Sequence, residues 1–202
     1  MQDNQRVWFI TFNYSNLQGL KAVPLGLLLL VVVYWANSQH GPASNLTLPI
    51  LVSLGAAILY WWVDRYYKTH YGRVERTSKQ TRTEVIIGIL GGIVALPAVY
   101  VDLTHPYPVS MVGFVFALAF VVEYRRIHRQ RKVAYLLWQM VIGFVIVLGV
   151  NLLPLFGMDG WWQALGLRSH FLAVLVVTSL VMVITGLCGH VFFTRQFPRS
   201  EG

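Results

Sequence analysis

The feature that most constrains this chain is the near absence of charge from six long apolar stretches. The 202 residues include only 16 Lys and Arg and 8 Asp and Glu, and nearly all of them lie between these stretches. A helix needs about 20 mostly apolar residues, each rising about 1.5 Å, to cross the hydrocarbon of a bilayer. We therefore expect an all-α integral membrane protein with six transmembrane helices. The predicted spans are residues 22–37, 46–63, 85–103, 108–124, 133–155 and 168–194.

Six spans leave room only for short loops. Charged residues make up 12% of the chain, about half their share in an average soluble domain. We therefore expect a single polytopic membrane domain over residues 1–202, preceded within it by an interfacial N-terminal segment, residues 1–21, that is rich in aromatic side chains. Tight connections such as residues 103–108, which contain two prolines, predict that the spans pack as three antiparallel hairpins.

The basic residues predict the orientation of these spans. Fifteen of the 16 Lys and Arg residues fall in the N-terminal segment, residues 64–84, residues 123–132 and the C-terminal segment, and Arg168 is the exception. Because cytoplasmic loops carry the excess of Lys and Arg, both termini are expected in the cytoplasm. We expect the protein in the plasma (inner) membrane. Attraction to anionic headgroups accounts for the net charge of +8 without any binding of nucleic acid.

The segment that follows the second span interleaves tyrosines with cations. Its spacing predicts that the span continues as a helix, which Gly72 is suited to end. Such a pattern suits contact with anionic headgroups, a phosphorylated ligand or an acidic partner, and its simpler interpretation is a helix end that anchors the protein at the interface. The candidate headgroup- or ligand-binding residues here and after the fourth span are Arg65, Tyr66, Tyr67, Lys68, His70, Tyr71, Arg73, Arg76, Arg125, Arg126 and Arg129.

Polar groups within the spans are few. Pro97 interrupts the backbone hydrogen bonding of the third span, and in some transporters such a break marks the substrate site. Uncharged polar side chains inside spans most often bond to a neighbouring helix or to their own backbone. Asp64 lies next to Arg65 at the inner end of its span, and we expect a salt bridge with Arg65 or snorkelling to the interface to accommodate its charge. The candidates for lining a cavity are Pro97, Gln139, Asn151, Thr178 and Thr185.

Small residues at helical spacing indicate close helix packing. Gly88 and Gly92 form one such pair in the third span, and Gly113 and Ala117 form another in the fourth. Small side chains let two membrane helices approach closely. The partner of each pair is either another span of this chain or a second copy of it.

Metal and cofactor chemistry have little support in the sequence. Four ionisable residues fall on the predicted outer side, and nitrogen and carboxylate ligands suit zinc, but their spacing is a weak signal. We expect neither a metal nor a cofactor. The weak metal candidates are Asp102, His105, Asp159 and His170.

No motif in the chain predicts a reaction. It lacks the serine elbow, the paired-histidine zinc motif and the phosphate-binding loop that mark common enzyme classes. We favour a non-catalytic binding, scaffolding or regulatory membrane component that acts through a basic, aromatic cytoplasmic face, with membrane lipids as partners and a homo-oligomer or larger membrane complex as its setting. The alternative is a transporter of a small or lipid-like molecule, and the second alternative is an intramembrane enzyme.

Overall fold

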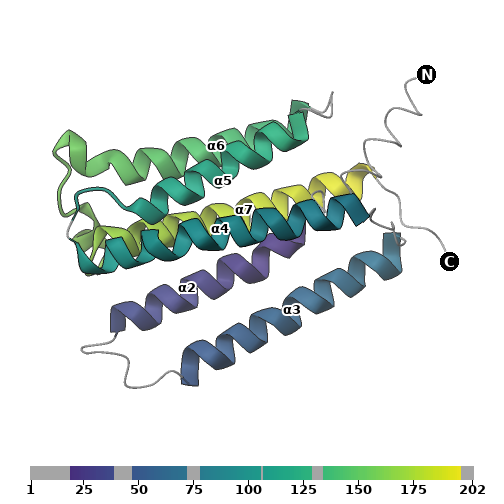
Figure 1. Ribbon diagram of the computed structural model, residues 1–202, viewed down its shortest axis with the longest axis horizontal. Helices are drawn as coiled ribbons and strands as arrows, with labels where there is room; N and C mark the ends of the chain where they lie inside the picture. The colour runs from purple at the N-terminus through teal and green to yellow at the C-terminus, as the bar shows by residue number, and fades with distance from the viewer. Residues whose placement is uncertain (1–18, 39–46, 72–77, 106, 129–133, 197–202) are drawn as a thin grey trace.

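The computed structural model describes residues 19–38, 47–71, 78–105, 107–128 and 134–196, which form six long helices and three short 3-10 helices (Figure 1). The long helices are α2 (Ala22–Ser38), α3 (Thr47–Tyr71), α4 (Ser78–Thr104), α5 (Met111–His128), α6 (Ala134–Leu152) and α7 (His170–Gln196). The short ones are η1 (Gly19–Lys21), η2 (Leu153–Phe156) and η3 (Trp161–Leu165). The described residues contain no strand, and the predicted all-α class is confirmed.

Several of these helices have the length and composition of membrane spans. Four segments are long and apolar enough to cross a bilayer, and these are Gly19–Ser38, Thr81–Thr104, Gln139–Phe156 and His170–Arg195. Within the described residues α3 and α5 do not meet the same measure, and both carry charged side chains in their last turns. The helices thus agree with the predicted membrane class, while the crossing of α3 and α5 stays a prediction.

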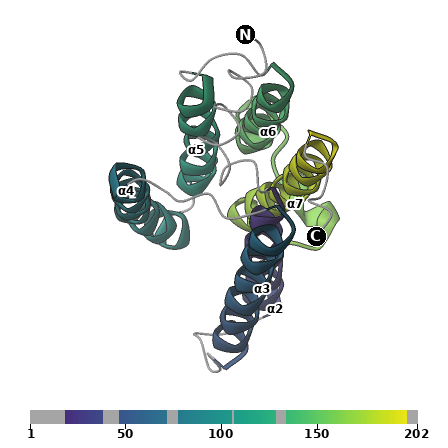
Figure 2. The same cartoon turned by 90° about the vertical axis from the view of Figure 1, so that its right-hand side faces the viewer.

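Helix α7 lies at the centre of the bundle. It packs against α2 on one side and α6 on the other, and it also contacts α5. Helix α3 packs against α2, and α4 packs against α5, so these two helices lie on the outside (Figures 1 and 2). Consecutive long helices run in alternate directions along the bundle (Figure 1).

Two apolar clusters hold the helices together. One joins α2, α4, α5 and α7, and the other joins α5, α6 and α7. Burial of such side chains removes apolar surface and fills the space between helices, which favours the bundle through dispersion contacts. The first cluster consists of Val33, Ala98, Val112, Leu172 and Leu175, and the second of Ala117, Val147 and Val181.

The closest approach between helices involves glycines at the contact of α2 with α7. A Cβ atom on Gly26 would lie 2.8 Å from a Val183 methyl group and 2.9 Å from the Ser179 carbonyl oxygen. Gly19, in η1, lies directly against Gly186 and Gly189 of α7. Small residues permit this approach because the two backbones come within van der Waals contact.

The two small-residue pairs predicted for packing have different surroundings. A Cβ atom on Gly113 would lie 2.6 Å from Cγ of Asn151, and Ala117 is buried in the second cluster. By contrast, a Cβ atom on Gly88 or Gly92 would meet no described atom within 4 Å. The face of α4 that carries Gly88 and Gly92 has no close neighbour among the described residues, and its packing against a second copy stays a prediction.

Candidate functional site at the basic end of the bundle

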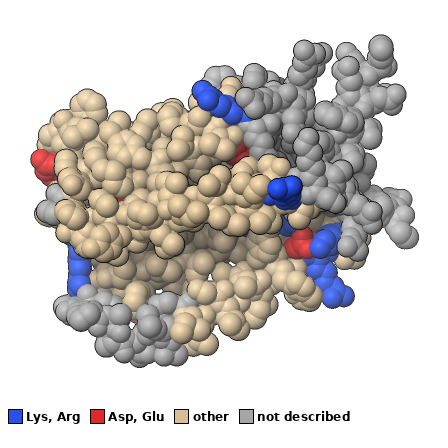
Figure 3. All heavy atoms as spheres, in the orientation of Figure 1, with Lys and Arg blue, Asp and Glu red and all other residues tan. Residues whose placement is uncertain are grey.

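Most of the Lys and Arg residues that the structure describes lie on helix ends that share one end of the bundle, on the right of Figure 1. We call this the basic end. It consists of η1, the first turns of α2 and α4 and the last turns of α3, α5 and α7. Figure 3 shows most of the blue side chains toward this end, next to residues drawn in grey. The grouping agrees with the charge distribution along the sequence.

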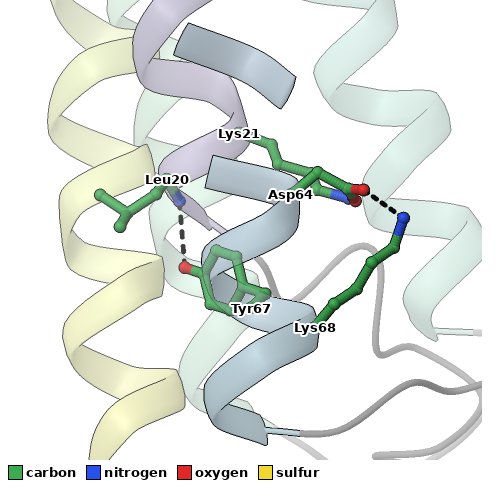
Figure 4. A network of polar contacts seen from close by, with 5 residues as sticks. All are labelled: Leu20, Lys21, Asp64, Tyr67 and Lys68. Carbon is green, nitrogen blue, oxygen red and sulfur yellow. Dashed lines mark hydrogen bonds and ion pairs between the residues drawn. The ribbon is translucent and has the colours of Figure 1, made fainter. Parts of the chain in front are cut away.

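Helix α3 continues to Tyr71, as the spacing of its last residues predicted, and Tyr67 fixes this end to the bundle (Figure 4). The Tyr67 side chain is completely buried. Its hydroxyl oxygen accepts a hydrogen bond from the Leu20 N–H at 3.4 Å and lies 2.8 Å from Nδ1 of His190. One hydroxyl group therefore joins η1, α3 and α7. Because it is buried, Tyr67 cannot contact a ligand from the surface.

A shared carboxylate gives the second connection between these elements. Asp64 forms salt bridges with Lys21 through one oxygen and with Lys68 through the other. Burial raises the pKa of the Asp64 carboxyl, but the hydrogen bonds and charges of Lys21 and Lys68 outweigh burial, and the resulting pKa lies below its ordinary value. The predicted partner, Arg65, is not the one observed. Arg65 points along another side of α3, since successive residues of a helix are about 100° apart.

Other aromatic rings pack around the side chain of Tyr67. Phe193 is also completely buried, and its ring centroid lies 5.3 Å from that of Tyr67 and 4.9 Å from that of Tyr71. Tyr66 packs against His70 with centroids 4.6 Å apart and meets the ring of His190 edge-on at 6.1 Å. Edge-to-face pairs of this kind add to the stability of the contact. The main role of these tyrosines is therefore to pack the end of α3 against the bundle.

The outward side of the same helix end carries indoles and cations. Trp61 and Trp62 are 57% and 68% exposed. The Arg65 guanidinium lies 5.5 Å from the centroid of a Trp61 ring, and the Lys21 ammonium lies 5.6 Å from that of Tyr60. The Lys68 side chain is half exposed. A cation over an aromatic face is attracted by the ring quadrupole, so the contact with Trp61 holds the exposed Arg65 at the surface, whereas the Lys21 side chain is only 12% exposed.

The remaining predicted ligand-binding residues are more widely distributed. His70 is exposed, and its Nδ1 lies 3.0 Å from the Tyr66 carbonyl oxygen. Arg125 is exposed on α5. Arg126 belongs to α5, but its side chain lies outside what the structure describes, and Arg73, Arg76 and Arg129 lie outside the described residues.

The cavity candidates are not brought together by the described contacts. Pro97 is exposed on α4, and Gln139 is half-buried on α6. The Thr185 hydroxyl donates to the Val181 carbonyl in its own helix at 2.7 Å. Thr178 is completely buried, and among the described residues its hydroxyl has no hydrogen-bond partner. Asn151 is also completely buried, and it belongs to a separate network.

That network lies at the opposite end of the bundle, which we call the far end. The Asn151 side chain accepts from the Ser110 N–H at 2.8 Å and donates to the Ser110 carbonyl at 3.0 Å. Asp102 accepts from the Ser110 hydroxyl and from the first two N–H groups of α5, those of Met111 and Val112, at 2.7–2.9 Å. Acceptors at a helix N-terminus satisfy donors that have no partner within the helix.

The predicted metal candidates serve other contacts at the far end. His170 is buried, and its Nε2 lies 3.1 Å from the Asn151 carbonyl oxygen. His105 bonds to Thr104 through Nδ1 and stacks on Tyr107, and Asp159 is exposed. In the part of the chain that the structure describes, no three His, Cys, Asp or Glu side chains are placed to hold a metal.

Sequence reasoning missed several residues that build the basic end. His190 and Phe193 hold Tyr67, Lys21 supplies the second cation on Asp64, and Gly19 makes the close contact with α7. A weak signal existed for His190, because a histidine within an apolar helix needs a polar partner at the same depth. The contacts of Lys21 and Gly19 have no signal in the local sequence, since their partners lie far along the chain.

No protein-family model matches this chain, and no significant match to it was found among curated proteins or among solved structures. The geometry of the basic end is therefore the basis for assigning a function. Cations supported on aromatic rings are groups that bind anions at a membrane surface. The buried Tyr67, which pairs with His190 and packs against Phe193, holds α3 in place.

Proposed function

We propose that this protein is a six-span component of the plasma (inner) membrane that binds a negatively charged surface through its basic end and catalyses no reaction. The six spans correspond to α2 to α7, packed as three antiparallel hairpins. Both termini face the cytoplasm, because the basic end carries the excess of Lys and Arg that cytoplasmic segments carry. The proposed partners are anionic headgroups on the cytoplasmic side, within a homo-oligomer or a larger membrane complex.

One observation carries this proposal, namely that the two sides of the last turns of α3 differ in burial and in chemistry. Tyr67 faces inward and is buried, whereas Arg65 and Lys68 face outward and are exposed. Inward hydrogen bonds fix the helix end, so the outward cations are presented in a defined arrangement. Orientation in the membrane requires only a few basic residues, and the surplus at this end suits an anionic partner.

The interior of the bundle favours binding over transport. Asn151 has partners for both its amide oxygen and its amide nitrogen, Gly113 is tightly packed against it at the far end, and Val147 is completely buried in the second apolar cluster. A transporter needs polar groups that line a path. The buried hydroxyl of Thr178, which has no hydrogen-bond partner among the described residues, favours the transporter, which we retain as the alternative.

Cysteine labelling tests the orientation. In a Cys188→Ser background, Ser44→Cys and Gln163→Cys are expected to react with an impermeant thiol reagent added outside intact cells. Ser78→Cys is expected to react only after the membrane is opened. Labelling of Ser78→Cys from outside would overturn the topology.

The amount of lipid and of partner protein that co-purifies with the protein tests the binding role. Replacing Arg73, Arg76, Arg125 and Arg129 together by Gln leaves most of the basic residues in place, so the topology is expected to persist. Each Lys or Arg near an anionic surface contributes about 1 kcal/mol of attraction. We therefore expect less co-purified anionic lipid or acidic partner in the variant than in the wild type. Equal content would show that these charges serve orientation only, and transport would become the leading hypothesis.

A further inference from the structure

A continuous stripe of exposed side chains runs the length of α3. Residues three or four positions apart share one side of a helix, and Leu51, Leu54, Ile58, Trp61 and Arg65 follow this spacing on α3. The four apolar members are each 57–62% exposed. Lys68 adjoins the stripe in the final turns. Because α3 packs against α2 and lies at the edge of the bundle (Figure 2), this side faces away from the protein.

The chemistry changes along the stripe in a fixed order. It starts with aliphatic side chains, continues with the Trp61 indole and ends with the guanidinium of Arg65 and the ammonium of Lys68. A phospholipid presents the same order: an acyl chain, then the glycerol ester region, then the phosphate. Indoles favour the interfacial level between the hydrocarbon and water, and cations at the adjoining level attract anionic headgroups.

The charges at the end of the stripe leave a net positive site. Asp64 carries one negative charge, and it already has two cationic partners, Lys21 and Lys68. Among the described residues no carboxylate lies within salt-bridge distance of Arg65, whose guanidinium rests over the Trp61 ring. Arg65 therefore offers its N–H groups in a forked arrangement that matches the oxygens of a phosphate. The partly paired ammonium of Lys68 is close by along the helix.

We propose that this stripe binds one anionic phospholipid of the cytoplasmic leaflet. Arg65 and Lys68 contact its phosphate, Trp61 lies beside its glycerol ester region, and Ile58 and Leu54 contact an acyl chain. The proposal rests on the proposed function, because it requires the basic end to face the cytoplasm. It is narrower, since it assigns the headgroup to α3 and to no other part of the basic end.

Binding of defined lipids to the purified protein tests this assignment. The full-length protein in detergent is titrated with phosphatidylglycerol, and bound lipid is counted by native mass spectrometry, with phosphatidylcholine as the zwitterionic comparison. The test variant is Arg65→Gln with Lys68→Gln. The matched control is Arg82→Gln with Arg195→Gln, which removes the same charge from the basic end but not from α3. A thermal unfolding transition verifies that each variant is folded. If the double variant is not folded, Arg65→Gln alone is used as the test variant.

The expected result is a selective loss. Apparent affinity for phosphatidylglycerol falls about fivefold for each α3 cation removed, whereas the control stays within about twofold, because neither Arg82 nor Arg195 belongs to the α3 stripe that contacts the phosphate. Phosphatidylcholine binds more weakly than phosphatidylglycerol to the wild type. Trp61→Leu weakens lipid binding too, which a site for free phosphate would not predict.

The other outcomes separate this inference from the broader proposal. Equal losses in the α3 variant and the control would mean a diffuse attraction to the whole basic end, which overturns the lipid site but retains the binding role. Loss of an acidic protein partner from the α3 variant, with lipid binding unchanged, would assign the stripe to a protein and likewise overturn the lipid site. No change in either variant would overturn the lipid site, and the four-arginine variant would then decide the binding role.

Discussion

The two ends of this bundle use polar residues in opposite ways. At the far end, Asp102, Ser110, Asn151 and His170 bond inward, and three of the four are at least nine-tenths buried. At the basic end, Tyr67 bonds inward in a similar manner, but neighbouring cations on the same helix remain exposed. Buried polar groups cost free energy unless they are paired. The far end is therefore built for stability, and the basic end combines a stable support with a charged surface.

This difference separates two kinds of substitution. Changes at the far end are expected to alter the free energy of unfolding, because each polar group there completes the bonding of another. Changes to the outward side of α3 are expected to alter binding with little effect on stability, since exposed charges contribute little to it. Changes to the inward side of α3 are expected to have an intermediate effect on the free energy of unfolding.

Asn151→Ala is expected to destabilise the protein most. The substitution leaves the Ser110 N–H without the partner it has at 2.8 Å, which costs about 1–3 kcal/mol for a buried group, and the cavity adds to this loss. Thermal unfolding in detergent measures the effect. Gln139→Ala, at a half-buried position of the same helix, is the control and is expected to change little. Equal effects of the two substitutions would contradict the role of the network.

Gly113→Ala is expected to be the next most destabilising. Its new methyl group would lie 2.6 Å from Asn151 Cγ, and such overpacking costs about 1–3 kcal/mol. Gly88→Ala is the matched control, because no described atom lies within 4 Å of that methyl position. The double variant Gly113→Ala with Asn151→Ala should be less destabilised than the sum of the two single variants, since the smaller side chain makes room. Strict additivity would argue against direct contact.

Tyr67→Phe is expected to weaken the support of α3 modestly. It removes the contact with His190 at 2.8 Å and the acceptor for Leu20, and one hydrogen bond contributes about 1 kcal/mol. The packing of the ring on Phe193 is retained. Tyr100→Phe, at a position 66% exposed on α4, is the control for loss of a hydroxyl group. A melting temperature that is unchanged in Tyr67→Phe would show that the aromatic packing alone holds α3.

Asp64 is expected to give a small stabilisation that depends on pH. Its pKa is below the ordinary value in the folded protein, so its contribution is present above the ordinary pKa and is lost as the pH falls through the folded value. The difference in stability between wild type and Asp64→Asn should be about 1 kcal/mol or less near neutral pH. It should shrink in acid, below about pH 4. A difference that grows on acidification would have the wrong sign.

Part of this fold could be predicted because it depends on local patterns. Apolar runs and the charges between them predicted the helices, their membrane class and the gathering of basic residues at one end. The continuation of α3 to Tyr71 followed from the spacing of its last residues. At the site, the sequence predicted the last turns of α3 as a concentration of aromatic and basic side chains, but it treated all of them as one surface.

What the sequence determined by itself is the class of protein and the set of residues available at each end, because hydropathy and charge act on each segment separately. Only the tertiary structure decided which residues face inward. Leu54 and Ile58 are exposed while Tyr67 is buried, since in a membrane protein apolar side chains face lipid as readily as they face other helices. One of the two partners of Asp64 was likewise decided by the meeting of α3 with η1, which brings Lys21 across 43 positions of the chain. Gly113 packs closely and Gly88 does not, because the same small-residue spacing meets a neighbouring side chain in one case and, within the described residues, none in the other.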